Sequence, residues 1–335
     1  MAFQTIYCSQ QFFKDVILHR KDGLTNRIVY NIFRKMGTVF VDIPPEELKS
    51  LALGNPLFHE IILKNDGGSI RSYVNWSTEL DVSKLSTDLI FAESALLPNG
   101  DIIRKNFGYY IVNTDNEDDL VFFEENCSQL DTILLQKGGI AEGQSWKDQL
   151  QNGTLPVNAM VINDNYLFDI RRYDKRKEQS LFAILRTLIP SDLQSEFHLT
   201  ILASNGDGKL TKDWLAEKAE EIKRLRLCKN LKVNIVTHTS KDISHSRIIL
   251  TNYHLITTDR GFSVIEGSRV AEETSGDIKS IFLGLEKERI MANTTKTLHA
   301  TKLKDYRKIV KESMDCPNQC CFSVGDNFQN RLLFV

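Results

Sequence analysis

Three apolar, strand-like runs alternate with two amphipathic, helix-like segments in the second half of this chain, and this order constrains its fold most strongly. The runs are 159–168, which could instead form a small hairpin that turns at Asn163 and Asp164, 198–203 and 231–237, and the helical segments are 176–188 and 211–227. Apolar residues recur at helical spacing in both segments, which is typical of helices that cover one face of a sheet. The alternation predicts right-handed crossovers and a partly parallel central sheet. Ligand sites of such sheets usually form at the carboxyl ends of the strands.

A predicted β-hairpin, residues 244–267, follows the third run at once. Five of its positions stand out by residue type and spacing: His245, Arg247, Asn252, Gly261 and Ser263. The first three have the spacing H-x-R-x4-N, and the last two form a G-x-S further along. Side chains alternate along a strand, so positions 245 and 247 are expected on the same face. The spacing alone is common in proteins, and the preceding strand order gives it weight.

With these residues the hairpin resembles the phospholipase D-like superfamily, whose signature is H-x-K-x4-D followed by Gly-Ser or Gly-Thr on the return strand. The β-α-β-α-β-hairpin order is also similar to that family, including its divergent members in bacterial mobile-element and defence proteins. The resemblance covers about residues 156–285. It implies an α/β chain with a phospholipase D-like sandwich and a mixed sheet, and it leaves the first 150 residues unexplained. The loop-like stretch 137–154 places the domain boundary near 150, so we expect a separate α+β domain of unknown role, 1–150, before the phospholipase D-like domain, 151–335.

The resemblance implies a site that needs no metal or other cofactor. His245 would attack phosphorus and form a covalent intermediate, and Arg247 would clamp the phosphate oxygens. Asn252 and Ser263 would provide polar support. The chain departs from the signature at two positions. Arginine at 247 keeps the charge of the usual lysine, whereas Asn252 lacks the carboxylate that would orient and stabilise an imidazolium.

Active members of this family carry two such motifs that face one site. His19, Lys21 and Asn26 match H-x-K-x4-N in number only, because Gly23 and the lack of an apolar strand make the match accidental. A single motif can still build a complete site if two chains pair symmetrically across it. A catalytic form of this chain is therefore expected to be a homodimer.

Basic residues are dense between residues 171 and 232, and a basic face there could follow a phosphate backbone. The positions selected as nucleic-acid contacts are Arg171, Arg172, Lys209, Lys212 and Lys232. The alternative is a solvated helix surface on which Glu217, Glu220 and Glu221 balance the positive charges. The formal net charge of the whole chain is only -2, so any binding of nucleic acid requires a local basic surface.

Other patterns carry less information. The turn at 205–209 lacks the alternating oxygen ligands of a calcium loop and the Gly-Lys-Ser/Thr ending of a phosphate loop. The scattered carboxylates of the first half are expected to be surface charges. The cluster CPNQCC, 316–321, has no second pair of ligands at zinc spacing. Without a secretory signal or a long apolar run, the chain is expected in the cytoplasm.

The first half of the chain predicts shorter elements. Strands are expected at 4–8 and 38–43, helices at 26–36 and 45–53, an exposed acidic loop at 113–119, a helix that follows 121–123 and runs through 135, and loop-like chain at 137–154. Two functions follow from the whole sequence. The first is a nucleic-acid phosphodiesterase of a bacterial mobile-element or phage-defence system. The second is an inactive module that binds nucleic acid or a partner protein within a complex.

Overall fold

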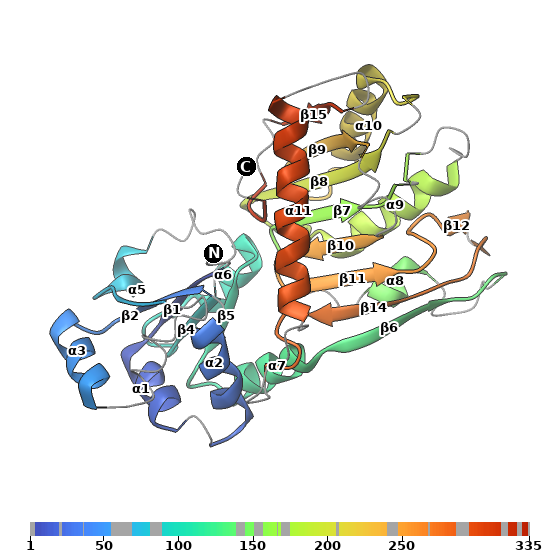
Figure 1. Ribbon diagram of the computed structural model, residues 1–335. Helices are drawn as coiled ribbons and strands as arrows, with labels where there is room; N and C mark the ends of the chain where they lie inside the picture. Colours follow the sequence, from blue (N-terminus) through green and yellow to red (C-terminus); the bar gives the residue numbers. More distant parts are fainter. Residues whose placement is uncertain are drawn as a thin grey trace. The chain divides into compact units, whose positions relative to one another are not determined.

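The computed structural model describes residues 4–19, 22–35, 37–54, 69–80, 89–138, 145–150, 157–165, 167–168, 175–205, 208–239, 247–266, 269–285, 295–315, 321–326 and 330–333. The chain divides into two compact units (Figure 1). Unit 1 comprises residues 1–129 and 282–297, and unit 2 comprises 130–281 and 298–335. The division at 129 differs from the expected boundary near 150, because the strand that begins at residue 130 pairs within the sheet of unit 2.

Unit 1 is built on a parallel sheet whose strands are separated along the chain by helices. Its elements are β1 Gln4–Cys8, α1 Gln10–Leu18, α2 Leu24–Lys35, β2 Gly37–Val41, α3 Pro45–Gly54, β3 Ser69–Ser72, α5 Trp76–Glu79, β4 Leu89–Ala92, α6 Gly100–Phe107, β5 Tyr110–Asn113 and α7 Glu117–Ser128. The strand order is β3-β2-β1-β4-β5, and all of these described pairs are parallel. Unit 1 is therefore an α/β domain, and the expected α+β class is wrong.

The carboxyl half of unit 1 also departs from the expected elements. The acidic stretch 113–119 is not one loop, because α7 already begins at Glu117 with Asn116 as its cap. The Asn116 side chain accepts hydrogen bonds from the backbone N–H groups of Asp118 and Asp119. Acidic residues in a first turn complement the helix dipole, and the sequence interpretation took this signal for solvation.

Unit 2 is built on a larger, mixed sheet. Its elements are β6 Leu130–Leu135, α8 Trp146–Leu150, β7 Ala159–Asn163, α9 Lys175–Leu188, β8 Glu196–Ser204, α10 Lys212–Arg224, β9 Asn230–His238, β10 Ile248–Thr251, β11 His254–Thr258, β12 Ile265–Glu266, β13 Arg269–Val270, β14 Thr274–Ser280, most of α11 Thr295–Asp315, and β15 Ser323–Gly325. The strand order of the large sheet is β15-β9-β8-β7-β10-β11-β14-β6.

The predicted β-α-β-α-β-hairpin order is confirmed as β7, α9, β8, α10, β9 and then β10 with β11. The strands β7, β8 and β9 are parallel, whereas β10 runs antiparallel to β7 and pairs with β11 as the hairpin. The sheet is thus mixed, as expected. The expected strand 159–168 is shorter, because β7 ends at Asn163.

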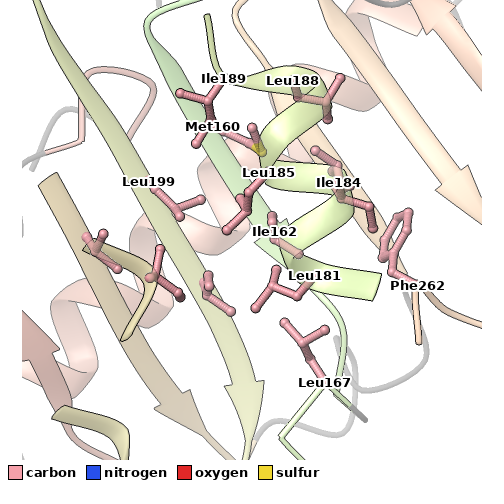
Figure 2. Packing of buried hydrophobic residues seen from close by; sticks show 14 of the residues in the cluster. Met160, Ile162, Leu167, Leu181, Ile184, Leu185, Leu188, Ile189, Leu199 and Phe262 are labelled. Carbon is pink, nitrogen blue, oxygen red and sulfur yellow. The ribbon is translucent and has the colours of Figure 1, made fainter. Parts of the chain in front are cut away.

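Two apolar layers cover the sheet of unit 2. On one face α8, α9 and α10 pack through residues such as Leu185, Leu188 and Ile222, and Figure 2 shows Met160, Ile162 and Leu199 of the strands beneath α9. On the other face the long helix α11 crosses the strands and buries Leu303, Tyr306 and Val310 (Figure 1). Covering both faces explains why β7 and β10 are apolar at nearly every position.

Among the described residues, the longest helices are too polar or too short to cross a membrane.

Candidate functional site

The parallel strands β7, β8 and β9 all end at one edge of the sheet of unit 2, which we name the carboxyl edge. Buried or half-buried polar residues end these strands: Asn163, Asp164, Ser204, Asn205 and His238. β10 begins at the same edge, because Ile248 pairs with Asn163. Arg247, the residue before Ile248, therefore lies at the carboxyl edge, where the strand order predicted a site.

Arg247 is held by the segment that follows the hairpin. Its Nη1 atom donates a hydrogen bond to the carbonyl oxygen of Asp259, and its own carbonyl accepts one from the backbone N–H of Thr258 at 3.2 Å. The carboxylate of Asp259 is itself fixed, since it accepts hydrogen bonds from Thr274 Oγ1 and Ser275 N, both at 2.8 Å. Burial raises the pKa of Asp259, but these hydrogen bonds outweigh burial and lower the pKa below its ordinary value.

Gly261 lies where this segment approaches both Arg247 and Asp164. Its φ angle is +94°, a left-handed conformation that favours glycine. A Cβ atom at this position would lie 2.9 Å from Asp164 Oδ2 and 3.2 Å from Arg247 Cδ. The glycine of the G-x-S pattern is therefore required both by its backbone conformation and by the close approach of two charged side chains.

Ser263 follows two residues later and is half-buried. Its Oγ atom is buried and has no hydrogen-bond partner among the described residues. A buried hydroxyl without a partner costs free energy, so such a group is a reasonable donor for a ligand at this edge. Two segments of the predicted motif thus meet at the carboxyl edge: Arg247 before β10, and the stretch after β11 that contains Gly261 and, two residues on, Ser263.

Asn252 does not belong to this group. It follows β10 at the opposite end from Arg247, where β7 begins. Its Oδ1 atom accepts hydrogen bonds from Asn158 N at 3.0 Å and Ala159 N at 3.1 Å, and its Nδ2 atom donates to Asn158 Oδ1 at 2.9 Å. The side chain is buried and clamps the hairpin to β7. Asn252 therefore has a structural role, and the expectation that it supports the site is wrong.

His245, Arg171 and Arg172 lie outside the described residues, so their predicted roles remain predictions. The other selected basic residues separate into two groups. Lys209 and Lys212 are exposed in the connection from the carboxyl end of β8 to α10, and so lie on the side of the carboxyl edge. Lys232 lies near the start of β9, at the opposite edge, where its Nζ atom is 3.5 Å from Glu196 Oε1.

The accidental second motif is confirmed as accidental by its setting. His19 ends α1 and pairs with Asp22 at 3.2 Å, and Asn26 lies inside α2. No strand leads into either residue. Among the described residues, no group of three or more His, Cys, Asp or Glu side chains could hold a metal ion.

A second polar edge, which the sequence interpretation missed, occurs in unit 1. Ser9 and Glu93 directly follow β1 and β4, and Ser9 Oγ donates to Glu93 Oε1 at 2.7 Å. These neighbouring strands flank the point where the strand order reverses, which is the usual ligand position in open parallel sheets. Burial, with a smaller effect of Glu93, raises the pKa of the Cys8 thiol well above its ordinary value. The signal in the sequence was a polar residue directly after each apolar strand.

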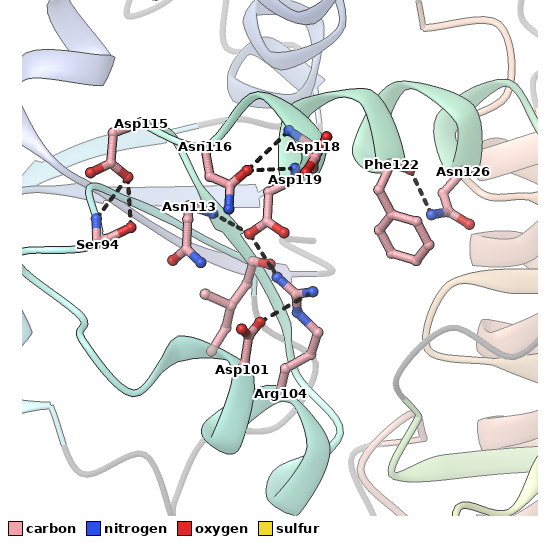
Figure 3. A network of polar contacts seen from close by, with 11 residues as sticks. Ser94, Asp101, Arg104, Asn113, Asp115, Asn116, Asp118, Asp119, Phe122 and Asn126 are labelled. Atoms are coloured by element: carbon pink, nitrogen blue, oxygen red, sulfur yellow. Dashed lines mark hydrogen bonds and ion pairs between the residues drawn. The ribbon is translucent and has the colours of Figure 1, made fainter.

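The neighbouring strand end in unit 1 is occupied by internal contacts (Figure 3). Asp119 Oδ2 accepts hydrogen bonds from Asn113 N at 3.0 Å and from Arg104 Nη2 at 2.9 Å. Ser94 donates to Asp115 Oδ1 through both its backbone N–H and its hydroxyl, and these bonds lower the pKa of Asp115. This network stabilises the turns after β4 and β5. Its charged side chains are bound to one another and to the backbone of unit 1.

Two histidines are buried away from the carboxyl edge, near the turn of the hairpin. His299 Nε2 on α11 donates to the carbonyl oxygen of Thr251 at 2.9 Å, and His254 starts β11. Burial lowers the pKa of His254 to about 3, with a further contribution from His299. Burial also lowers the pKa of His299 to about 4, against the hydrogen bond to Thr251. Both imidazoles are therefore neutral at pH 7 and structural.

Comparison with models of protein families and with curated protein sequences finds no match to this chain.

Proposed function

We propose that unit 2 is a phospholipase D-like domain that binds a phosphodiester of nucleic acid at its carboxyl edge. The observation that carries this proposal is the close approach of Gly261 to Arg247 at the end of β7, with the buried hydroxyl of Ser263 two residues further on. A guanidinium matches the geometry of phosphate oxygens, and a buried hydroxyl adds a hydrogen bond. The exposed Lys209 and Lys212 on the same side add positive charge for the backbone.

We further propose that the domain cleaves its ligand through His245 without a metal ion. The imidazole would attack phosphorus, the bond to the leaving oxygen would break, and water would later release the phosphate from histidine. The absence of a carboxylate at 252 no longer argues against this reaction, because Asn252 serves the fold at the far end of β10. With one motif in each chain, two chains would have to supply one site.

The second candidate is a module of the same fold that binds nucleic acid, or a partner subunit, without cleavage. It is favoured by the presence of a single motif, because the accidental match at His19 cannot act as the second. Both candidates would belong to a cytoplasmic system of the mobile-element or phage-defence kind, a setting that rests only on the resemblance of the hairpin.

One experiment separates the two candidates. The purified protein is incubated with labelled single- and double-stranded DNA and RNA in the presence of a chelator, beside His245→Ala. Cleavage that disappears in the variant supports the phosphodiesterase. Binding by both proteins without cleavage supports the module. Failure of both proteins to bind any of the four nucleic acids contradicts the proposed function. A monomeric mass under assay conditions contradicts the catalytic candidate alone.

A further inference from the structure

Asp164, the residue that follows β7, is the carboxylate that lies within the candidate site. Its side chain is fully buried, and its Oδ2 atom accepts a hydrogen bond from the backbone N–H of Phe262 at 2.9 Å. This bond fixes the middle of the segment 261–263, between the glycine and the serine. No local pattern in the sequence connects Asp164 with the motif, because it lies about eighty residues before the hairpin.

Asp164 also lies close to the guanidinium group of Arg247. The ideal Cβ position at Gly261 is 2.9 Å from Asp164 Oδ2 and 3.4 Å from Arg247 Nε. Because both atoms lie near this one point, Asp164 Oδ2 and Arg247 Nε are at most about 6.3 Å apart. Opposite charges at this range stabilise one another, and a buried carboxylate requires such compensation. Arg247 thus donates to the carbonyl oxygen of Asp259 and lies within electrostatic range of Asp164.

We infer that Asp164 is a positioning residue of the phosphate site: it holds Arg247 and the segment 261–263 in the conformation that binds the ligand. The inference rests on the proposed function of unit 2. In this chain the carboxylate that serves the motif comes from the end of β7 and not from position 252, where the asparagine is committed to the hairpin clamp.

The physical reason is preorganisation. An arginine side chain has several rotatable bonds, and ordering it at the moment of binding costs free energy. The carboxylate of Asp164 and the carbonyl oxygen of Asp259 restrict the guanidinium of Arg247 before the ligand binds. The N–H groups that donate to a phosphate are therefore already ordered. Neutralising Asp164 removes the electrostatic restraint, whereas an asparagine there can still accept the hydrogen bond from Phe262 N. Asp164→Asn therefore separates the effect of charge from the effect of the segment contact.

The test measures the affinity of a fluorescein-labelled single-stranded oligonucleotide by anisotropy, with inorganic phosphate as the competitor. Asp164→Asn is expected to weaken oligonucleotide binding by about tenfold and to weaken competition by phosphate in parallel. In a protein that already carries Arg247→Ala, the same substitution is expected to change the affinity by less than about twofold. Such non-additivity shows that Asp164 acts through Arg247, which a purely structural role would not produce.

Asp119→Asn is the matched control, because Asp119 in unit 1 also accepts a hydrogen bond from a backbone N–H and faces an arginine. It is expected to leave the oligonucleotide affinity unchanged. Wild-type affinity in Asp164→Asn, or equal losses with and without Arg247, overturns the inference while the proposed function stands. Failure of the wild-type protein to bind oligonucleotide or phosphate overturns the proposed function itself, and the inference with it.

Discussion

At the scale of single residues, the hairpin motif separates into two parts with different tasks. Arg247, Gly261 and Ser263 lie at the carboxyl edge, whereas Asn252 holds backbone at the other end of β10. Spacing in the sequence placed all of them in one pattern. Only the register of β10 against β7 shows that the pattern spans the full length of a strand and therefore joins two ends of the sheet.

Gly261→Ala is expected to weaken nucleic-acid binding and to lower the free energy of unfolding by about 1–2 kcal/mol. The physical reason is the left-handed φ angle together with a methyl group only 2.9 Å from Asp164 Oδ2. Equilibrium unfolding in urea and oligonucleotide anisotropy measure the two effects. Gly138→Ala is the matched control in the same unit, because φ is +80° there and nothing lies within 4 Å of the added methyl group. Equal affinities in the two variants would contradict the role of Gly261 at the site.

At the scale of elements, the hairpin of β10 and β11 is attached to the sheet by side chains as well as by strand pairing. Asn252 accepts from two backbone N–H groups at the start of β7, and His299 on α11 donates to Thr251 at the same turn. These contacts join three elements that are far apart in the sequence. They fix the hairpin turn, and through β10 they fix the strand that leads back to Arg247.

Asn252→Leu is expected to destabilise unit 2 without changing the chemistry of the site. Two buried backbone N–H groups would lose their acceptor, at a cost of about 1–3 kcal/mol each. Asn252→Asp keeps an acceptor for both N–H groups, but it loses the Nδ2 donor to Asn158 Oδ1 and buries a carboxylate, so it is also expected to lower the free energy of unfolding. Urea unfolding measures the difference, and anisotropy is expected to give wild-type oligonucleotide affinity for Asn252→Asp. A restored or enhanced activity in Asn252→Asp would show instead that position 252 serves the reaction.

At the scale of the whole molecule, the chain is built from two α/β units of different design. Unit 1 has a wholly parallel sheet with a polar strand edge at Ser9 and Glu93, and unit 2 has a mixed sheet that carries the motif. The chain passes between the units near residues 129, 281 and 297. Unit 2 is therefore discontinuous, and it contains both the hairpin and the helix α11 that covers its second face.

Acid is expected to destabilise unit 2 through His254 and His299. An unfolded histidine titrates near pH 6.5, whereas burial holds the folded pKa values at about 3 and about 4. The unfolded chain therefore takes up protons that the folded unit cannot, and the free energy of unfolding falls as the pH drops below about 6.5. The loss is up to about 1.4 kcal/mol per pH unit for each histidine until the folded pKa values are reached.

Urea unfolding followed by tryptophan fluorescence between pH 7 and pH 4 measures this dependence. In the double variant His254→Gln and His299→Gln, the free energy of unfolding is expected to fall less steeply with pH, while other titrating groups act equally in both proteins. The glutamine at 299 can still donate to the carbonyl oxygen of Thr251. Parallel pH profiles for the two proteins would exclude these histidines as the cause of acid destabilisation.

Much of unit 2 could be predicted because its elements have clear local patterns. The helix α10 begins after Thr211, whose hydroxyl accepts from Trp214 N, and β8 and β9 alternate apolar and polar residues before they end in short apolar runs, which is a strand pattern. Unit 1 was harder to predict because its strands β3, β4 and β5 are short and its helix α7 is strongly acidic. Short apolar runs and acidic first turns are ambiguous without their tertiary neighbours.

The sequence by itself determined the order of elements in unit 2 and the hairpin, and it predicted which residues would bind a phosphate. These are local properties, because the spacing of apolar residues, the helix caps and the turn residues each depend on only a few neighbouring positions. Only the tertiary structure decided that β6 belongs to unit 2, that Asn252 is a clamp, and that Asp164 lies beside Arg247. Strand register and the meeting of distant strand ends depend on packing across the whole sheet, which no local pattern records.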